Sequence, residues 1–159
     1  MATTVTPATA TVTISCAISL AGQDKGFSHS YTVPLVTEVH NRIMNVPTSE
    51  MAVLTFTASN PGTSSVPGLN EADVRFIVLT NLDDTNFIQI ILASENNNEC
   101  VHKLEAGHSM IIPISFEGVV DVHDALDSAI SSVSFDDLTT ITALANTASC
   151  DLQVFAVGV

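Results

Sequence analysis

The stretch that decides the fold of this chain spans residues 72–116 and reads ADVRFIVLTNLDDTNFIQIILASENNNECVHKLEAGHSMIIPISF. Its apolar runs are separated by short polar clusters, in the order strand, tight turn, strand, polar loop, strand, tight turn, strand. Residues 73–80 and 86–92 are almost continuously apolar, which predicts central strands covered on both faces. Because the stretch contains no catalytic constellation, we expect an all-β module that works through shape and contact.

Strand patterns continue on both sides of this stretch. Residues 12–20 alternate apolar with small polar side chains, which predicts a strand with one buried face. Further strand candidates are residues 28–36, 39–46, 51–58, 100–104, 109–115, 139–144 and 151–157. Strands at these intervals are typical of a sandwich, so we predict an all-β, jelly-roll-like antiparallel β-sandwich. One short helix is an alternative to strand within residues 121–138, where four apolar residues have helical spacing.

The chain of 159 residues is long enough for one domain with a real core. Residues 1–11 are rich in Thr, Ala and Pro without an apolar period, so we expect an extended N-terminal arm. Residues 12–159 are then a single β-sandwich domain. Residues 59–70 contain two Pro-Gly pairs and form the most loop-like part, and a loop of this length is typically functional.

The charge balance limits the partners of the chain. Four basic residues stand against 17 acidic ones, giving a formal net charge of −13. We expect no nucleic-acid binding, because phosphate affinity comes mostly from Lys and Arg, and no adhesion to anionic membranes for the same reason. A basic protein surface remains a compatible partner. We also expect no membrane-spanning segment and no secretory signal, since no basic start and apolar run are visible.

The three cysteines form an odd set without a Cys-x-x-Cys pair. We expect reduced thiols in a protein made in the cytosol, with a disulfide between two of them as the alternative. Cys16 shares a strand face with Ile14 and Ile18, and Cys150 shares one with apolar neighbours. Both thiols are therefore predicted to be buried and unoxidised.

The best candidates for metal ligands are Cys100, His102 and His108. Cys100 and His102 point to the same face of a strand, and His108 follows after one turn. Zinc needs three or four converging ligands, and the only nearby candidates for a fourth are Glu99 or Glu105. A cupin-type metal barrel would in addition require a His-x-His pair, which this chain lacks. We therefore expect no bound metal.

The acidic residues that could collect calcium oxygens are Asp83, Asp84, Asp121, Asp124 and Asp127. Their spacing does not match an EF-hand loop, and Asp is common in tight turns for backbone reasons alone. Asp136 and Asp137 are expected in a similar loop role. Whether the acidic loops bind calcium is left open by the sequence.

Enzyme signatures are absent from the sequence. Glycosidase chemistry would need two carboxylates in a cleft with aromatic stacking partners, and the chain has one Tyr and no Trp. The sequence contains no G-x-S-x-G, no P-loop and no G-x-G-x-x-G. We therefore predict no catalytic and no cofactor-binding residues.

Two stretches carry a family resemblance: VLTNLDDTNFIQIILASENNNECVHKLEAGHSMIIPIS and the ending ITALANTASCDLQVFAVGV. With the strand end T-N-L-D, the restart T-N-F-I, the later K-L-x-A-G-x-S and the turn I-x-A-x-A-x-T-A-x-C, the chain resembles small virion structural proteins of tailed bacteriophages. The resemblance covers roughly the C-terminal half. It implies a jelly-roll-like fold and a capsid decoration, head–tail or tail-associated protein that acts as an oligomer.

The expected function is thus that of a non-enzymatic virion structural protein, located in the virion after synthesis in the host cytoplasm. Its expected partners are capsid or tail proteins and further copies of itself. A closed homo-oligomer would bury apolar surface that one domain leaves open, and a trimer is favoured. The alternatives are a carbohydrate- or ligand-binding β-sandwich module and a cupin-type metal enzyme.

Overall fold

The residues that the computed structural model describes are 5–57, 69–96, 98–114 and 135–159. They form β-strands and connecting segments, and no helix occurs among them. The chain divides into two compact units, of which the first ends at Glu38 and the second comprises Val39–Gly158.

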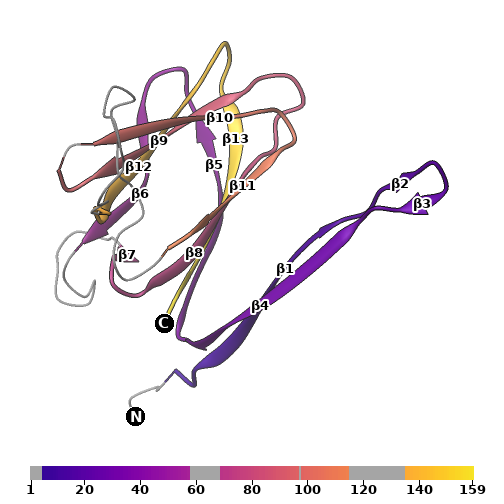
Figure 1. Ribbon diagram of the computed structural model, residues 1–159. Helices are drawn as coiled ribbons and strands as arrows, with labels where there is room; N and C mark the ends of the chain where they lie inside the picture. Colours follow the sequence, from indigo (N-terminus) through magenta and orange to yellow (C-terminus); the bar gives the residue numbers. More distant parts are fainter. Residues whose placement is uncertain (1–4, 58–68, 97, 115–134) are drawn as a thin grey trace, which may run out of the picture. The chain divides into compact units, whose positions relative to one another are not determined.

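The second unit is a sandwich of two sheets (Figure 1). The five-stranded sheet has the order β10-β9-β12-β6-β7, and the four-stranded sheet has the order β11-β8-β13-β5. Strand pairing is antiparallel within the group β10-β9-β12-β6 and within the group β11-β8-β13. The two-residue β7 instead pairs parallel to β6. The strands are β5 (Glu38–Val46), β6 (Met51–Thr57), β7 (Leu69–Asn70), β8 (Val74–Asn81), β9 (Ile88–Ser94), β10 (Glu99–Leu104), β11 (Ser109–Pro113), β12 (Leu138–Ala145) and β13 (Cys150–Gly158).

The order of the strands is that of a jelly roll. Apart from β7, each sheet receives four strands, and the chain passes repeatedly between the sheets, with only β9 and β10 as consecutive neighbours in one sheet. Eight antiparallel strands divided in this way between two sheets make the double Greek key of the jelly roll. The all-β sandwich predicted from the sequence is therefore confirmed.

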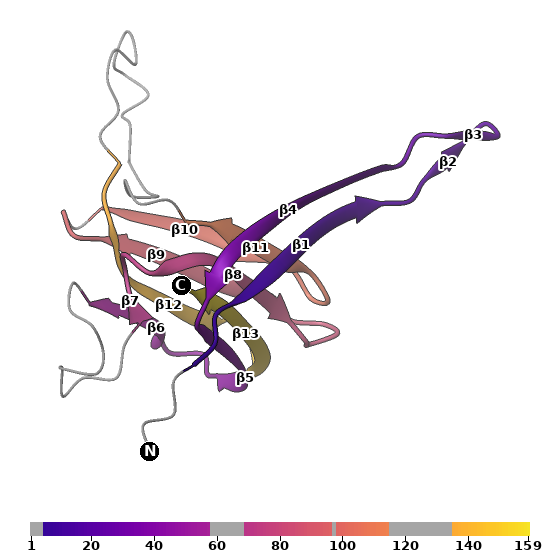
Figure 2. The ribbon, with the colours of Figure 1, turned by 90° about the horizontal axis from the view of Figure 1, so that it is seen from below.

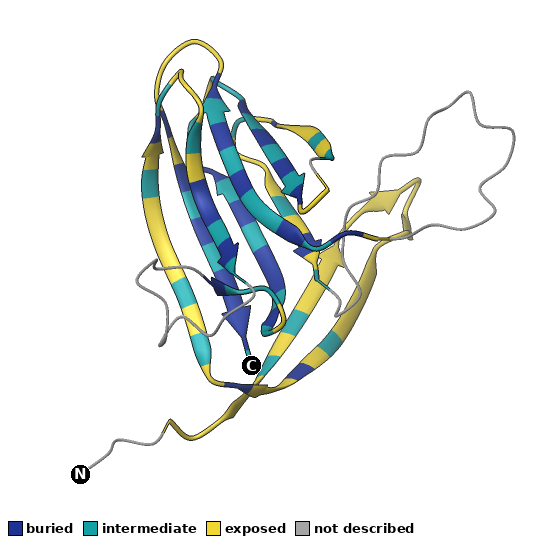
Figure 3. Ribbon diagram, turned by 90° about the vertical axis from the view of Figure 1, so that its left-hand side faces the viewer, coloured by how far each residue is buried: buried dark blue, intermediate teal, exposed yellow. Residues whose placement is uncertain are grey.

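The core lies between the two sheets and is built by alternation along each strand. Both sheets supply aliphatic side chains that are almost completely buried, the largest of which are Ile77, Leu79, Ile88, Ile90, Ile141 and Leu152. Figure 3 shows this alternation as dark bands along the sandwich strands. Because each fully buried aliphatic side chain contributes about 1.5–3 kcal/mol, this layer dominates the stability of the sandwich.

β8 and β9 occupy interior positions of their sheets, as the apolar runs predicted. In β9, buried residues alternate with half-buried ones, so only one face is fully covered. In β8, the alternation is interrupted by two consecutive buried residues, Phe76 and Ile77, so its second face is covered in part. The expectation of two covered faces was wrong for β9 and holds in β8 only at Phe76, because a strand in a two-layer sandwich has the main core on one side. Apolar residues on the other side are consequently left partly open.

The first unit is a β-ribbon, by which we mean residues 8–36. Its long strands are β1 (Ala8–Cys16) and β4 (Phe27–Val36), which pair antiparallel and form a two-stranded sheet of their own. Near the tip, β2 (Ser19–Leu20) pairs with β3 (Gln23–Asp24). Figure 2 shows β1 and β4 running side by side along their length.

The tip of the ribbon is a two-residue turn. Ala21 and Gly22 connect the paired residues Leu20 and Gln23 and have φ angles of 51° and 76°. Two consecutive positive φ angles are the requirement of a type I′ turn, which matches the twist of a hairpin. Gly22 adopts this conformation freely, whereas the Cβ atom of Ala21 opposes it.

We expect the substitution Ala21→Asn to stabilise the tip by about 0.5–1 kcal/mol, because Asn tolerates the left-handed conformation better than Ala. Amide hydrogen exchange measured by NMR should then slow by about threefold at Leu20 and Gln23. Gly22→Ala is the opposing variant and should accelerate the same exchange. Equal exchange rates in all three chains would contradict the turn geometry.

The boundaries of three segments differ from the sequence expectation or lie outside the described residues. The sequence predicts a boundary between the first segment and the sandwich after residue 11, whereas the compact units divide after Glu38. The reason is that residues 12–36 pair within the ribbon and join neither sandwich sheet. The loop expected over residues 59–70 ends in β7, and its residues up to 68 lie outside the described part of the chain. The helix considered within residues 121–138 likewise lies outside it, apart from residues 135–138.

Candidate functional site

The ribbon has two chemically different faces, which follow from its register. Because side chains alternate along each strand and partners across the ladder share a side, two sets of residues separate. The apolar face consists of Ala10, Val12, Ile14, Cys16, Phe27, His29, Tyr31 and Val33. The hydroxyl face consists of Thr11, Thr13, Ser15, Ser28, Ser30 and Thr32. A hydrogen bond of 2.9 Å between the Thr13 and Ser30 hydroxyl groups lies on the hydroxyl face.

The apolar face is open to solvent toward the tip of the ribbon. Phe27 is 58% exposed and Ile14 is 37% exposed, and Leu20 at the tip is 64% exposed. Most of the ribbon is accordingly yellow in Figure 3. An isolated two-stranded ribbon is at best marginally stable in water, so this surface is suited to contact with another molecule.

Cys16 is an example of the exposure of this apolar face. The sequence predicted it to be buried together with Ile14 and Ile18, but all three side chains are exposed. The alternation was identified correctly, but β1 joins a two-stranded sheet that lacks a second layer over this part of the face. The prediction of a buried Cys16 was therefore wrong.

The ribbon is also nearly free of charge. Asp24 and Lys25 are the only charged side chains before Glu38, so the entire net charge of −13 falls on residues 38–159. Surfaces without charge are the places where two strongly acidic molecules can approach with the least repulsion.

A second surface with little charge is the outer face of the four-stranded sheet, that is, the side of β11-β8-β13-β5 turned away from the core. The ladder aligns Ile111 of β11 with Val78 of β8, and Val78 with Phe155 of β13. On β5, Ile43 is 62% exposed, and it lies between Asn41 and Asn45, which bond to Gln153 and Asp151 on the outer side of β13. The apolar residues of this face that are exposed or half-buried are Val39, Ile43, Val78, Ile111 and Phe155.

The orientation of β5 on this face follows from two side-chain hydrogen bonds. Asn41 accepts a bond of 3.2 Å from the Gln153 amide, and Asn45 donates a bond of 3.0 Å to Asp151. Asp151, at one end of β13, is a charged side chain on this face. The sequence contained a signal for this apolar outer face: β8 and β13 have more apolar residues than one core face of each strand requires.

The motifs that carry the family resemblance meet at one end of the sandwich, around Asn81. This side chain is fully buried and donates to the carbonyl oxygens of Asn86 (2.8 Å) and Leu104 (3.2 Å). Its own carbonyl oxygen accepts a bond of 3.1 Å from the backbone N–H of Asp83. Next to it, the hydroxyl groups of Thr80 and Ser109 are 2.9 Å apart. The motifs T-N-L-D and K-L-x-A-G-x-S therefore hold neighbouring turns together.

Asp83 is used by the backbone of its own turn. One carboxylate oxygen accepts hydrogen bonds from the backbone N–H groups of Thr85 (2.8 Å) and Asn86 (2.6 Å). These bonds, the one from Asn86 first, lower the pKa of the Asp83 carboxyl group below its usual value. Asp84 accepts a bond of 2.8 Å from the Thr85 hydroxyl group. Both residues thus have the turn role that their position predicted.

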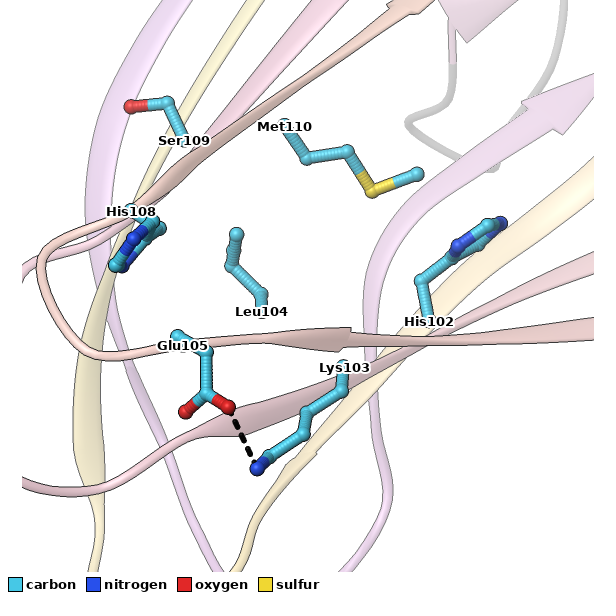
Figure 4. A pocket seen from close by; sticks show the side chains of 7 residues that line it. All are labelled: His102, Lys103, Leu104, Glu105, His108, Ser109 and Met110. Atoms are coloured by element: carbon cyan, nitrogen blue, oxygen red, sulfur yellow. Dashed lines mark ion pairs between the residues drawn. The ribbon is translucent and has the colours of Figure 1, made fainter.

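The candidate metal ligands are only partly brought together. The Cys100 thiol and His102 Nε2 are 3.3 Å apart, as their common strand face predicted. His108 Nδ1 instead lies 2.8 Å from the Ala106 carbonyl oxygen in the β10–β11 turn. Figure 4 shows His102 and His108 at opposite sides of the shallow pocket between these strands, with an exposed ion pair of 2.6 Å between Lys103 and Glu105.

Within the described ranges, no three His, Cys, Asp or Glu side chains converge in an arrangement suited to hold a metal ion. Asp121, Asp124 and Asp127, the candidates for calcium ligands, lie outside these ranges.

The pKa of the Glu71 carboxyl group is raised, first by burial and then by the nearby charges of Asp137 and Glu95.

Asp136 is the centre of a buried hydrogen-bond network at the β9–β10 loop. Its carboxylate accepts bonds from Asn96 (2.7 Å), Asn98 (2.8 Å) and the Ser94 hydroxyl group (3.1 Å). The bond from Asn96 is the main cause that lowers the pKa of Asp136, and burial opposes it. The Asp136 carboxylate therefore fixes the loop to the start of β12.

The lowered pKa predicts an acid-dependent contribution to stability. A carboxyl group whose pKa is lower in the folded state stabilises the fold above its unfolded-state pKa and loses this effect as the pH falls through the folded value. We expect the urea midpoint of Asp136→Asn to lie below that of the parent chain at pH 7, because the new amide group faces three donors. The difference between the two urea midpoints should become smaller as the pH is lowered from about 6 to about 3. A difference that is independent of pH would contradict this role.

Cys150 is buried, as the sequence predicted. Its thiol lies 3.4 Å from the Ala148 carbonyl oxygen, and burial followed by the charges of Asp83 and Asp151 raises its pKa. All three cysteines are free thiols in the structure.

We expect iodoacetamide to leave Cys150 unmodified in the folded protein, because both burial and the raised pKa suppress its thiolate form. In urea above the unfolding midpoint it should react as fast as Cys16. Peptide mapping by mass spectrometry gives both rates. Rapid modification of Cys150 under native conditions would show that this end of the sandwich opens.

Comparison with known proteins finds no family model, no curated protein and no solved structure that matches the chain. In the described segments, no helix has the length and hydrophobicity needed to cross a membrane.

Proposed function

We propose that this chain is a non-enzymatic structural protein of a tailed-bacteriophage virion, and that it works through protein–protein contacts as a capsid decoration or head–tail component. The observation that carries this proposal is the ribbon, with a solvent-exposed apolar face and almost no charge. Such a surface suits contact with protein better than binding of a small polar ligand.

The jelly roll is compatible with this function, since viral capsid domains, lectins and cupins all use it. The fold alone therefore does not distinguish the proposal from its alternatives. A cupin-type enzyme would need His and Glu side chains converging in the interior, and the described His102 and His108 lie on the surface. A carbohydrate-binding module would use stacked aromatic side chains, of which this chain has few.

The proposal includes capsid or tail proteins and further copies of the chain as partners, with a trimer as the favoured oligomer. Neither nucleic acid nor membrane is expected as a partner, because the chain is strongly acidic. Its location would be the virion, after synthesis in the host cytoplasm.

The decisive test is mass spectrometry of particles purified on a density gradient from cells that express the genome encoding this chain. Peptides of the chain should co-purify with the particles and remain after a wash in high salt, since apolar contact is insensitive to screening. Intact particles without these peptides would overturn the proposal. Binding of a carbohydrate by the purified chain, or metal-dependent enzyme activity, would overturn it as well.

A further inference from the structure

We infer that the chain self-associates by exchange of the ribbon: the apolar face of one copy covers the outer face of the four-stranded sheet of another copy. The inference deepens the proposed function, on which it rests for the role of protein contact. It assigns both sides of a homo-oligomeric interface to described residues.

The first argument is chemical complementarity. The ribbon presents Ile14 and Phe27, and the outer face presents Ile43 and Ile111, all of them exposed. Each surface is large and apolar for a chain whose remaining surface is acidic and rich in Ser, Thr and Asn. Covering both surfaces at once removes apolar area from water on two sides of one contact.

The second argument is charge. Two copies that each carry −13 repel one another wherever their acidic surfaces meet. The ribbon contributes only Asp24 and Lys25, and the outer face contributes Asp151 at one end. The contact of ribbon with outer face thus brings few like charges together. A basic partner would be drawn to the acidic surfaces instead.

The third argument is area. With nine residues in β1, the ribbon face measures about 30 by 10 Å, or about 300 Å². Two ribbons packed on each other would bury only about 600 Å² in total, which is less than the roughly 1,200 Å² of a stable interface. In a closed exchange between two copies, each chain both donates a ribbon and accepts one, so the two contacts together bury about 1,200 Å² in total, the lower limit of a stable interface.

The test compares matched lysine variants by sedimentation analysis of the full-length chain. Ile14→Lys changes the apolar face of the ribbon, and Thr13→Lys changes the adjacent position on the hydroxyl face. Ile111→Lys changes the outer face, and Val101→Lys changes an exposed position of β10 in the other sheet. Because every variant reduces the net negative charge, a loss of association cannot result from stronger repulsion.

We expect Ile14→Lys and Ile111→Lys each to weaken self-association by at least about 10-fold, because each introduces a charge into an apolar contact. Thr13→Lys and Val101→Lys should associate like the parent chain. Circular dichroism and urea midpoints close to those of the parent chain show that each variant is folded. A second readout needs no substitution: alkylation of Cys16 on the apolar face should slow as the concentration of the parent chain rises.

Three outcomes would overturn the exchange. The parent chain could remain monomeric up to about 100 μM, a concentration at which even weak specific complexes form. Ile14→Lys could associate like the parent chain. Dissociation by Ile14→Lys but not by Ile111→Lys would show that ribbons pair with each other or with another surface. These results concern the purified chain alone, so they are distinguishable from the absence of the chain in purified particles, which tests the proposed function.

Discussion

Replacing Asn81 by Ala is expected to lower the free energy of unfolding of the sandwich by about 3 kcal/mol. The Asn81 side chain is fully buried and serves three backbone groups, the carbonyl oxygens of Asn86 and Leu104 and the N–H group of Asp83. Each buried backbone group that loses its partner costs about 1–3 kcal/mol, with water recovering part of the loss. Urea unfolding followed by far-ultraviolet circular dichroism measures the change.

Asn41→Ala is the matched control for this variant. Asn41 lies on the exposed side of β5, and its one hydrogen bond, to Gln153, is 3.2 Å long and exposed. We expect it to change the free energy of unfolding by less than about 0.5 kcal/mol. If the two variants were equally stable, the turns around Asn81 would be held by the strands alone.

Replacing Ile141 by Ala is expected to cost about 2–5 kcal/mol, because the substitution leaves a cavity in the middle of the core. Ile141 is fully buried in β12, between Leu54 of β6 and Leu92 of β9. The central position of β12 means that no flexible edge can collapse into the space. The urea midpoint should fall while the slope of the transition stays unchanged.

Val101→Ala provides the reference for Ile141→Ala. Val101 is on β10 in the same sheet but is 55% exposed. Its truncation should change the stability by less than about 0.5 kcal/mol. A cost for Ile141→Ala as small as that for Val101→Ala would mean that β12 does not lie in the centre of the sheet.

The candidate site was only partly predictable from the sequence. The alternation over residues 12–20 identified an apolar strand face, and the structure confirms that Cys100 and His102 share a side. Alternation states which residues share a side of a strand but not whether another layer covers that side. The exposure of Cys16 and the separation of His108 from the other two candidates therefore followed from strand pairing alone.

The division of the chain shows the same limit. Residues 12–36 have the pattern of sandwich strands, yet they form a ribbon of their own, because the choice of partner strand depends on contacts distant in sequence. Turn residues were more informative: Asp83 has the backbone role expected of Asp in a tight turn.

The sequence by itself determined the all-β class, most strand positions, the tight turns and the strongly acidic charge, because these depend on composition and on neighbours a few residues apart. Only the tertiary structure decided the order of strands in the two sheets, the separate ribbon and the central role of Asn81. Asn81 illustrates the physical reason: one of its hydrogen bonds reaches Leu104, 23 residues away in the chain, and no local pattern encodes such a contact.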